Sequence, residues 1–60
     1  MENNNLPLAL TVAEVSSLLR VGKNRVYEMI RSGVIYSVRV GRGIRVPRQA
    51  VLDFLSGAHQ

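Results

Sequence analysis

The chain has 60 residues, no cysteine, 47% hydrophobic residues and a formal net charge of +4. That length supports one small domain, which buries only about 60% of its unfolded surface, and the lack of cysteine excludes disulfides and thiolate metal sites. All eight basic residues lie between Arg20 and Arg48, a span that contains one acid, Glu28, so the local charge is +7. This concentration predicts an anionic partner, most often nucleic acid and less often a membrane surface.

The N-terminal segment "MENNN" is polar and carries an acid where a secretory signal peptide is basic. No apolar run approaches the length of a membrane-spanning helix. We therefore expect a cytoplasmic protein with no membrane partner. Residues 1–9 are expected to form a flexible lead, residues 10–56 the folded domain, and residues 57–60 a frayed tail.

Two helices joined by a tight turn are predicted first. The motif "TVAE", which Thr11 opens, is a capping box that satisfies two backbone amides at the start of a helix over about 12–19. Gly22 can cap a second helix over about 23–32, and Gly33 is suited to end it. The short turn between the helices is typical of a helix-turn-helix.

After the second helix the periodicity changes from helical to alternating, which predicts a β-hairpin. The valines and isoleucine of "VRV" and "IRV" are expected to face inward and the arginines outward, with "GRG" as the turn. A three-residue turn would pair Val40 with Ile44 and place Arg39 opposite Arg45. Tyr36 is expected to pack over the base of the hairpin.

A third helix is predicted over about 48–56, with Pro47 at its start and Gly57 at its end. Its expected buried face consists of Val51, Phe54 and Leu55. The predicted fold is therefore mainly α with a small β-hairpin: a winged helix-turn-helix made of helix 1, a recognition helix, a two-stranded wing and a C-terminal helix.

The second helix carries the side chains best suited to reading DNA. Asparagine can bridge adenine, arginine can bridge guanine, and a glutamate can accept from cytosine or pair with an arginine one turn on. Cations occupy the first turn, where exposed amides prefer an anion that a phosphate would supply. The candidate contacts on this helix are Lys23, Asn24, Arg25, Tyr27, Glu28 and Arg31. The alternative is an ordinary solvated helix face.

The hairpin predicts a second contact region. Arg42 projects between two glycines and could enter a narrow, A·T-rich minor groove. If arginines oppose each other across the strands they repel, and a phosphate would remove that conflict. Alternatively, Arg42 only keeps a turn soluble. The candidate wing contacts are Arg39, Arg42, Gly43 and Arg45, and the candidate phosphate contacts elsewhere are Thr11 and Arg20.

No arrangement suited to catalysis is recognisable. His59 is the one histidine and lacks a partner at ligand spacing, and the four carboxylates are scattered. The "GRG" segment lacks the lysine and helix of a phosphate-binding loop. We expect no enzymatic activity, no cofactor and no metal ion.

Residues 10–55, "LTVAEVSSLLRVGKNRVYEMIRSGVIYSVRVGRGIRVPRQAVLDFL", resemble the excisionase-like helix-turn-helix family, small winged-helix DNA binders related to the MerR DNA-binding domain. The resemblance includes the "LT" opening, "VY" and "IRSG" in the second helix, "VRVGR" in the wing and "RVPRQAV" before the last helix. Two positions depart from the family pattern, which places glycine at Arg20 and serine at Gly22.

The resemblance implies double-stranded DNA as the partner of a bacterial or phage-encoded, nucleoid-associated protein. Many family members are similar to excisionases, which bind and bend attachment-site DNA, often through cooperative contacts between copies, so that a tyrosine- or serine-family integrase excises a mobile element. Other members resemble small transcription regulators. Two further classes stay open: an RNA binder, although no aromatic cluster is evident, and a protein–protein adaptor, although no exposed apolar patch is evident.

Overall fold

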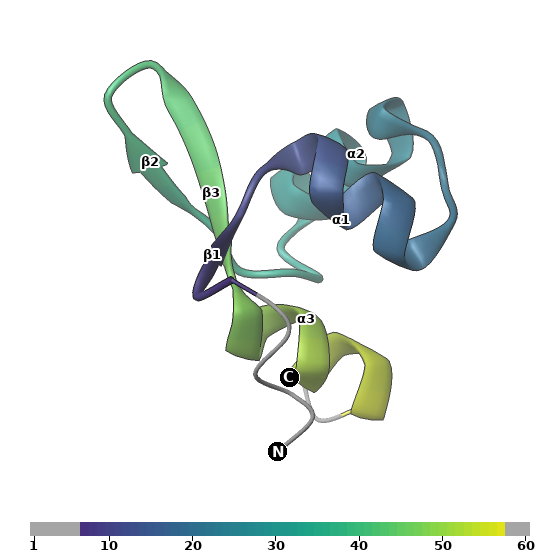
Figure 1. Cartoon of the computed structure of the whole chain (residues 1–60). Coiled ribbons are helices and arrows are strands. Elements are labelled where there is room, and N and C mark those ends of the chain that lie inside the picture. The colour runs from purple at the N-terminus through teal and green to yellow at the C-terminus, as the bar shows by residue number, and fades with distance from the viewer. Residues whose placement is uncertain (1–6, 58–60) are drawn as a thin grey trace.

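The computed structural model describes residues 7–57 of the chain. The elements in this part are β1 (Ala9–Leu10), α1 (Val12–Leu19), α2 (Lys23–Ser32), β2 (Val38–Val40), β3 (Gly43–Pro47) and α3 (Arg48–Ser56) (Figure 1). The three helices have the bounds that the sequence predicts, and the fold is the predicted winged helix-turn-helix. Pro47 is the N-cap of α3 rather than its first helical residue.

The three strands form one antiparallel sheet in the order β1-β3-β2. Strand β1 was not predicted: Leu10 pairs with Val46 and Ala9 with Pro47. Ala9 is therefore part of the sheet, although the sequence places it in the flexible lead. The predictions for residues 1–6 and 58–60, including His59, lie outside the described residues.

The hairpin formed by β2 and β3, here called the wing, has a different register from the predicted one. Val40 pairs with Gly43 and Arg39 with Ile44, so the turn contains two residues, Gly41 and Arg42. Gly41 has φ +61°, as the first central residue of a type II′ turn requires. Because side chains alternate along a strand, this shift of one residue moves each partner of β2 to the opposite face.

The expected opposition of Arg39 and Arg45 is therefore wrong. Arg45 lies opposite Val38, and the two arginines are on opposite faces of the wing. The expected inward orientation of Val38 and Val40 is also wrong: both are exposed. In Figure 1 the wing projects from the body as an arm, away from α3.

The core is small and apolar, and it lies where β1, β3 and the helices meet. Among the described residues, its buried members are Leu10, Val12, Val15, Val26, Ile35, Val46 and Val51. Two side chains expected to pack are instead exposed: Tyr36, at 66%, and Leu55, at 63%. In the loop between α2 and β2, Ile35 takes the buried position, which leaves the neighbouring Tyr36 exposed.

The turn between α1 and α2 is held by Ser16. Its hydroxyl donates to the Val21 carbonyl at 2.6 Å, and its own carbonyl accepts from the amides of Arg20 and Val21. Val21 packs against the core and fills the corner of the turn. These contacts fix the position from which α2 starts.

None of the helices in residues 7–57 has the length and hydropathy that a membrane-spanning helix needs.

Candidate nucleic-acid interface

The start of α2 differs from the start of α1. At α1 the predicted capping box is present: the Thr11 hydroxyl accepts from the Glu14 amide at 3.1 Å, and Glu14 Oε1 accepts from the Thr11 amide at 2.8 Å. At α2, Gly22 is the N-cap, no side chain caps the helix, and the first turn contains no acid. The α2 end therefore keeps backbone donors and positive dipole charge available to an external anion.

One side of α2 is buried and the other carries the polar candidates. Val26 is fully buried, and Met29 and Ile30 pack against the core. Every predicted contact residue of this helix is exposed: Lys23, Asn24, Arg25, Tyr27, Glu28 and Arg31. Five of the six line one shallow surface depression, namely Asn24, Arg25, Tyr27, Glu28 and Arg31. The structure thus brings these five candidates together on one accessible surface.

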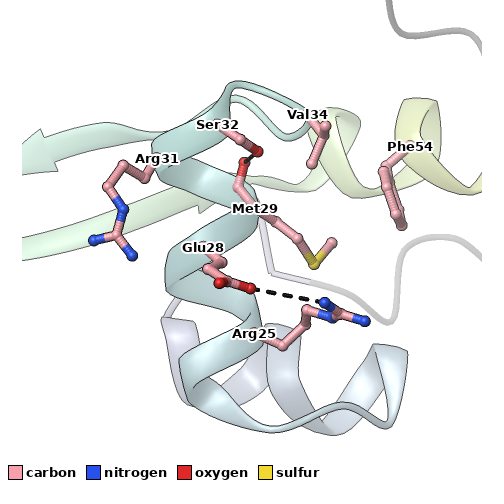
Figure 2. Close-up of a pocket in the computed structure, with 7 residues that line it drawn as sticks. All are labelled: Arg25, Glu28, Met29, Arg31, Ser32, Val34 and Phe54. Carbon is pink, nitrogen blue, oxygen red and sulfur yellow. Dashed lines mark hydrogen bonds and ion pairs between the residues drawn. The ribbon is translucent and has the colours of Figure 1, made fainter.

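Glu28 pairs with Arg25, at 3.7 Å between Oε1 and Nη1, rather than with Arg31. Both side chains are about two-thirds exposed, so the pair contributes little to stability. In Figure 2 the Arg31 side chain points away from the Arg25–Glu28 pair. The pair leaves Arg31 extended from the exposed face, while Glu28 offsets one of the cations near the helix start.

A groove beside α2 was not predicted from the sequence. It lies between α2 and α3, and Figure 2 shows the Met29 thioether and the Phe54 ring on its two walls. Its lining consists of Arg25, Glu28, Met29, Arg31, Ser32, Val34 and Phe54. The groove arises because α3 packs on β3 while α2 packs on α1, an arrangement that local sequence patterns do not encode.

The wing candidates divide between its two faces and its tip. Arg42 is exposed in the turn, Arg39 shares a face with Ile44, and Arg45 shares the other face with Val38. The Arg45 guanidinium folds back along the strand, and its Nη1 donates to the Ile44 carbonyl at 3.1 Å. A methyl group at Gly43 would lie 2.8 Å from that Nη1. Gly43 thus gives the guanidinium room to lie over the backbone.

The two remaining candidates flank the helix-turn-helix. The Thr11 hydroxyl accepts a hydrogen bond in the capping box, and its O–H can still donate to a phosphate oxygen. Arg20 is exposed and ends α1 in the left-handed conformation, with φ 60° and ψ 43°. Among residues 7–57 it is the one non-glycine residue with positive φ.

Comparison with known proteins agrees with this geometry. A family model described as "Helix-turn-helix domain" matches residues 9–59. An excisionase of Streptomyces ambofaciens is 43% identical over 49 residues, which are 82% of this chain and 79% of the relative. The chain belongs to the excisionase-like helix-turn-helix family. It is thus a DNA-binding helix-turn-helix domain.

Two other relatives of this excisionase-like chain are longer than the part they share with it. A "Putative DNA-binding protein" of Mycobacterium tuberculosis is 48% identical over 50 residues, 83% of this chain and 64% of the relative. A "Probable excisionase" of Saccharopolyspora erythraea is 44% identical over 45 residues, 75% of this chain and 46% of the relative. The chain therefore spans less than two-thirds of the length of these two relatives. No solved structure matches it.

The two positions at which this chain departs from the expected family pattern, Arg20 and Gly22, are both unfavourable for its own stability. The family places glycine at position 20, and the left-handed backbone there is the conformation that glycine adopts without strain. The family serine at position 22 would cap α2, whereas Gly22 leaves that start without a side-chain cap. Both changes fall on the corner that leads into α2.

Proposed function

We propose that the protein is an excisionase, a DNA-binding factor that bends attachment-site DNA so that an integrase excises a mobile element. The observation that carries the proposal is the exposed polar face of α2 together with an arginine-bearing wing, in a chain that is 43% identical to a protein named excisionase over 79% of that protein. The proposal assigns no chemistry to the chain itself, because the integrase would cut and rejoin the DNA.

In this proposal α2 lies in the major groove. Asn24 and Arg31 make base-edge contacts, Tyr27 donates its hydroxyl to a phosphate, and Glu28 moderates the charge of its neighbour. Phosphates lie beside the first turn of α2, where the dipole and two cations favour them. The residues assigned to phosphate contact are Lys23, Arg25, Arg20 and Thr11.

The wing tip then reaches the adjacent minor groove. Arg42, in the two-residue turn, is the residue that enters it. Because Arg39 and Arg45 lie on opposite faces of the wing, they would approach the two opposite walls of that groove rather than one shared phosphate. The sequence suggests that one phosphate lies between these two arginines; in this proposal each arginine contacts a different wall of the groove instead.

Selection from a random DNA library, followed by a bending assay on the recovered duplexes, tests the proposal. An excisionase should enrich tandem direct repeats and bend them, since several copies act together on one attachment site. An isolated or inverted site that stays straight would replace the proposal with a transcription regulator. Failure to enrich any duplex, together with recovery of RNA from a parallel RNA library, would replace it with an RNA-binding protein.

A further inference from the structure

In β2, the apolar side chains face solvent and the polar side chain is on the side that faces the core, the reverse of the usual arrangement. A strand that covers a core on one side usually turns apolar residues to the core and polar residues to water. In β2, Arg39 shares a face with the core-packed Ile44, whereas Val38 and Val40 face outward and are 38% and 55% exposed. This reversal leaves a β-branched apolar surface uncovered on a projecting arm.

Positive charge lies at the tip end of that apolar surface. Val38 lies opposite Arg45 and Val40 opposite Gly43, so these four residues share one side of the wing, here called the outer face. The Arg45 guanidinium lies over Gly43, which places it next to Val40 and toward the tip. Arg42 follows in the turn. The outer face therefore combines valine methyl groups with two guanidinium groups at its end.

The charge around the outer face limits which partner can bind it. From residue 29 to residue 52 the sequence contains five arginines and no acid. A partner that contacts the valines must therefore also carry strong negative charge. A second copy of the chain is not, because its net charge is +4. Its described carboxylates are also engaged: Glu14 with the Thr11 amide, Glu28 with Arg25, and Asp53 with Gln49. The wall of a DNA groove offers apolar deoxyribose rings next to phosphates, which matches valine methyl groups next to guanidinium groups.

We propose that the outer face packs against one deoxyribose-phosphate wall of the minor groove. Val38 and Val40 contact the sugar rings, Arg45 contacts the flanking phosphate, and Val40 acts as the wedge that widens the groove and bends the duplex. This inference rests on the proposed function for the DNA site itself, and it deepens that proposal by naming the apolar contacts that produce the bend.

Threonine substitutions test the apolar contact without altering charge. The double variant Val38→Thr/Val40→Thr keeps the β-branched shape and strand preference and replaces one methyl group per residue by a hydroxyl. On a duplex carrying one selected site, we expect binding about three- to tenfold weaker and a smaller bend angle. The slope of log K against log salt should stay unchanged, because no phosphate contact is lost.

Arg45→Gln tests the charged part of the same face. It should weaken binding and reduce the magnitude of the salt slope by about 0.9, the value expected for one phosphate contact. Leu55→Gln is the control for the valine substitutions, because Leu55 is an apolar residue on α3 that is more exposed, at 63%, than either valine. Its affinity, bend angle and salt slope should equal those of the unmodified protein.

Three results would overturn the inference. The first is a Val38→Thr/Val40→Thr variant that binds and bends one site as the unmodified protein does. The second is a loss confined to duplexes with tandem sites, which would assign the outer face to contacts between copies. The third is a lower melting temperature of the double variant that accounts for all of its weaker binding. Failure of the unmodified protein to bind any duplex would instead refute the proposed function.

Discussion

Replacing Arg20 by glycine should stabilise the fold and weaken DNA binding at the same time. Arg20 ends α1 with φ 60°, in the left-handed region that residues other than glycine rarely occupy. Its amide donates to the Ser16 carbonyl, and a glycine keeps that backbone hydrogen bond. The substitution therefore removes the steric cost of the Cβ atom and one exposed cation, and leaves the turn in place.

The magnitude follows from two opposing terms. A left-handed conformation costs a residue with a Cβ atom about 1–2 kcal/mol, and glycine offsets about 0.4–1 kcal/mol of that gain by its greater freedom in the unfolded chain. The free energy of unfolding should therefore rise by about 0.5–1 kcal/mol. For a domain of this size, the melting temperature should rise by about 2–8 °C.

Arg20→Ala is the matched control, because it removes the same charge and keeps the Cβ atom. Thermal unfolding followed by circular dichroism should place the glycine variant above the alanine variant, and the alanine variant close to the unmodified protein. Both variants should bind DNA more weakly, with a salt slope smaller in magnitude by about 0.9 if Arg20 contacts one phosphate. Equal melting temperatures of the two variants would show that Arg20 is not strained. If both variants bind DNA as tightly as the unmodified protein, Arg20 does not contact DNA.

Four further predictions concern the turn, the recognition helix, the wing and the salt dependence. Ser16→Ala removes the 2.6 Å hydrogen bond to the Val21 carbonyl and should lower the free energy of unfolding by about 1 kcal/mol, measured in the same thermal scans. Asn24→Ala should widen the range of DNA sequences recovered by selection more than it reduces total affinity, because base contacts give sequence specificity and phosphate contacts position the protein. If the variant recovers as narrow a range of sequences as the unmodified protein, Asn24 does not contact a base. Arg42→Ala should weaken binding and reduce bending without changing the melting temperature; unchanged affinity and bend angle would place the tip outside the interface. With roughly five to seven phosphates engaged, log K should fall against log salt with a slope of about −4.5 to −6, and a slope near zero would contradict an interface dominated by phosphates.

The helices were predictable because their signals are local. The capping box at Thr11 and the glycines at positions 33 and 57 lie at the observed helix ends, so spacing and cap chemistry were sufficient. The candidate face of α2 was predictable for the same reason: helical periodicity places its residues relative to the buried Val26. The partner of Glu28 was not, since arginines at both i−3 and i+3 are within reach.

The sheet was less predictable because its contacts are not local. Strand β1 contains two residues, too few to show a periodicity, and its pairing with β3 joins segments more than thirty-five positions apart in the sequence. The turn register was ambiguous because glycines on both sides of Arg42 allow a two-residue or a three-residue turn. A difference of one residue then exchanged the faces of the β2 side chains, which is why the exposed valines and the separation of Arg39 from Arg45 emerge only from the structure.

The corner between α1 and α2 combines three features that each lower stability. Arg20 occupies a strained backbone conformation, Gly22 provides no side-chain cap, and Lys23 and Arg25 place positive charge beside the positive end of the α2 dipole. The start of α1 differs, because the same short chain forms a full capping box there. A bound phosphate would offset two of these costs directly, because it would accept hydrogen bonds from the open amides and neutralise the cations. A contact with the Arg20 side chain would compensate for the backbone strain without removing it. In the proposed complex, DNA binding would therefore compensate for the stability lost at this corner, and the domain should unfold at a higher temperature when bound than when free.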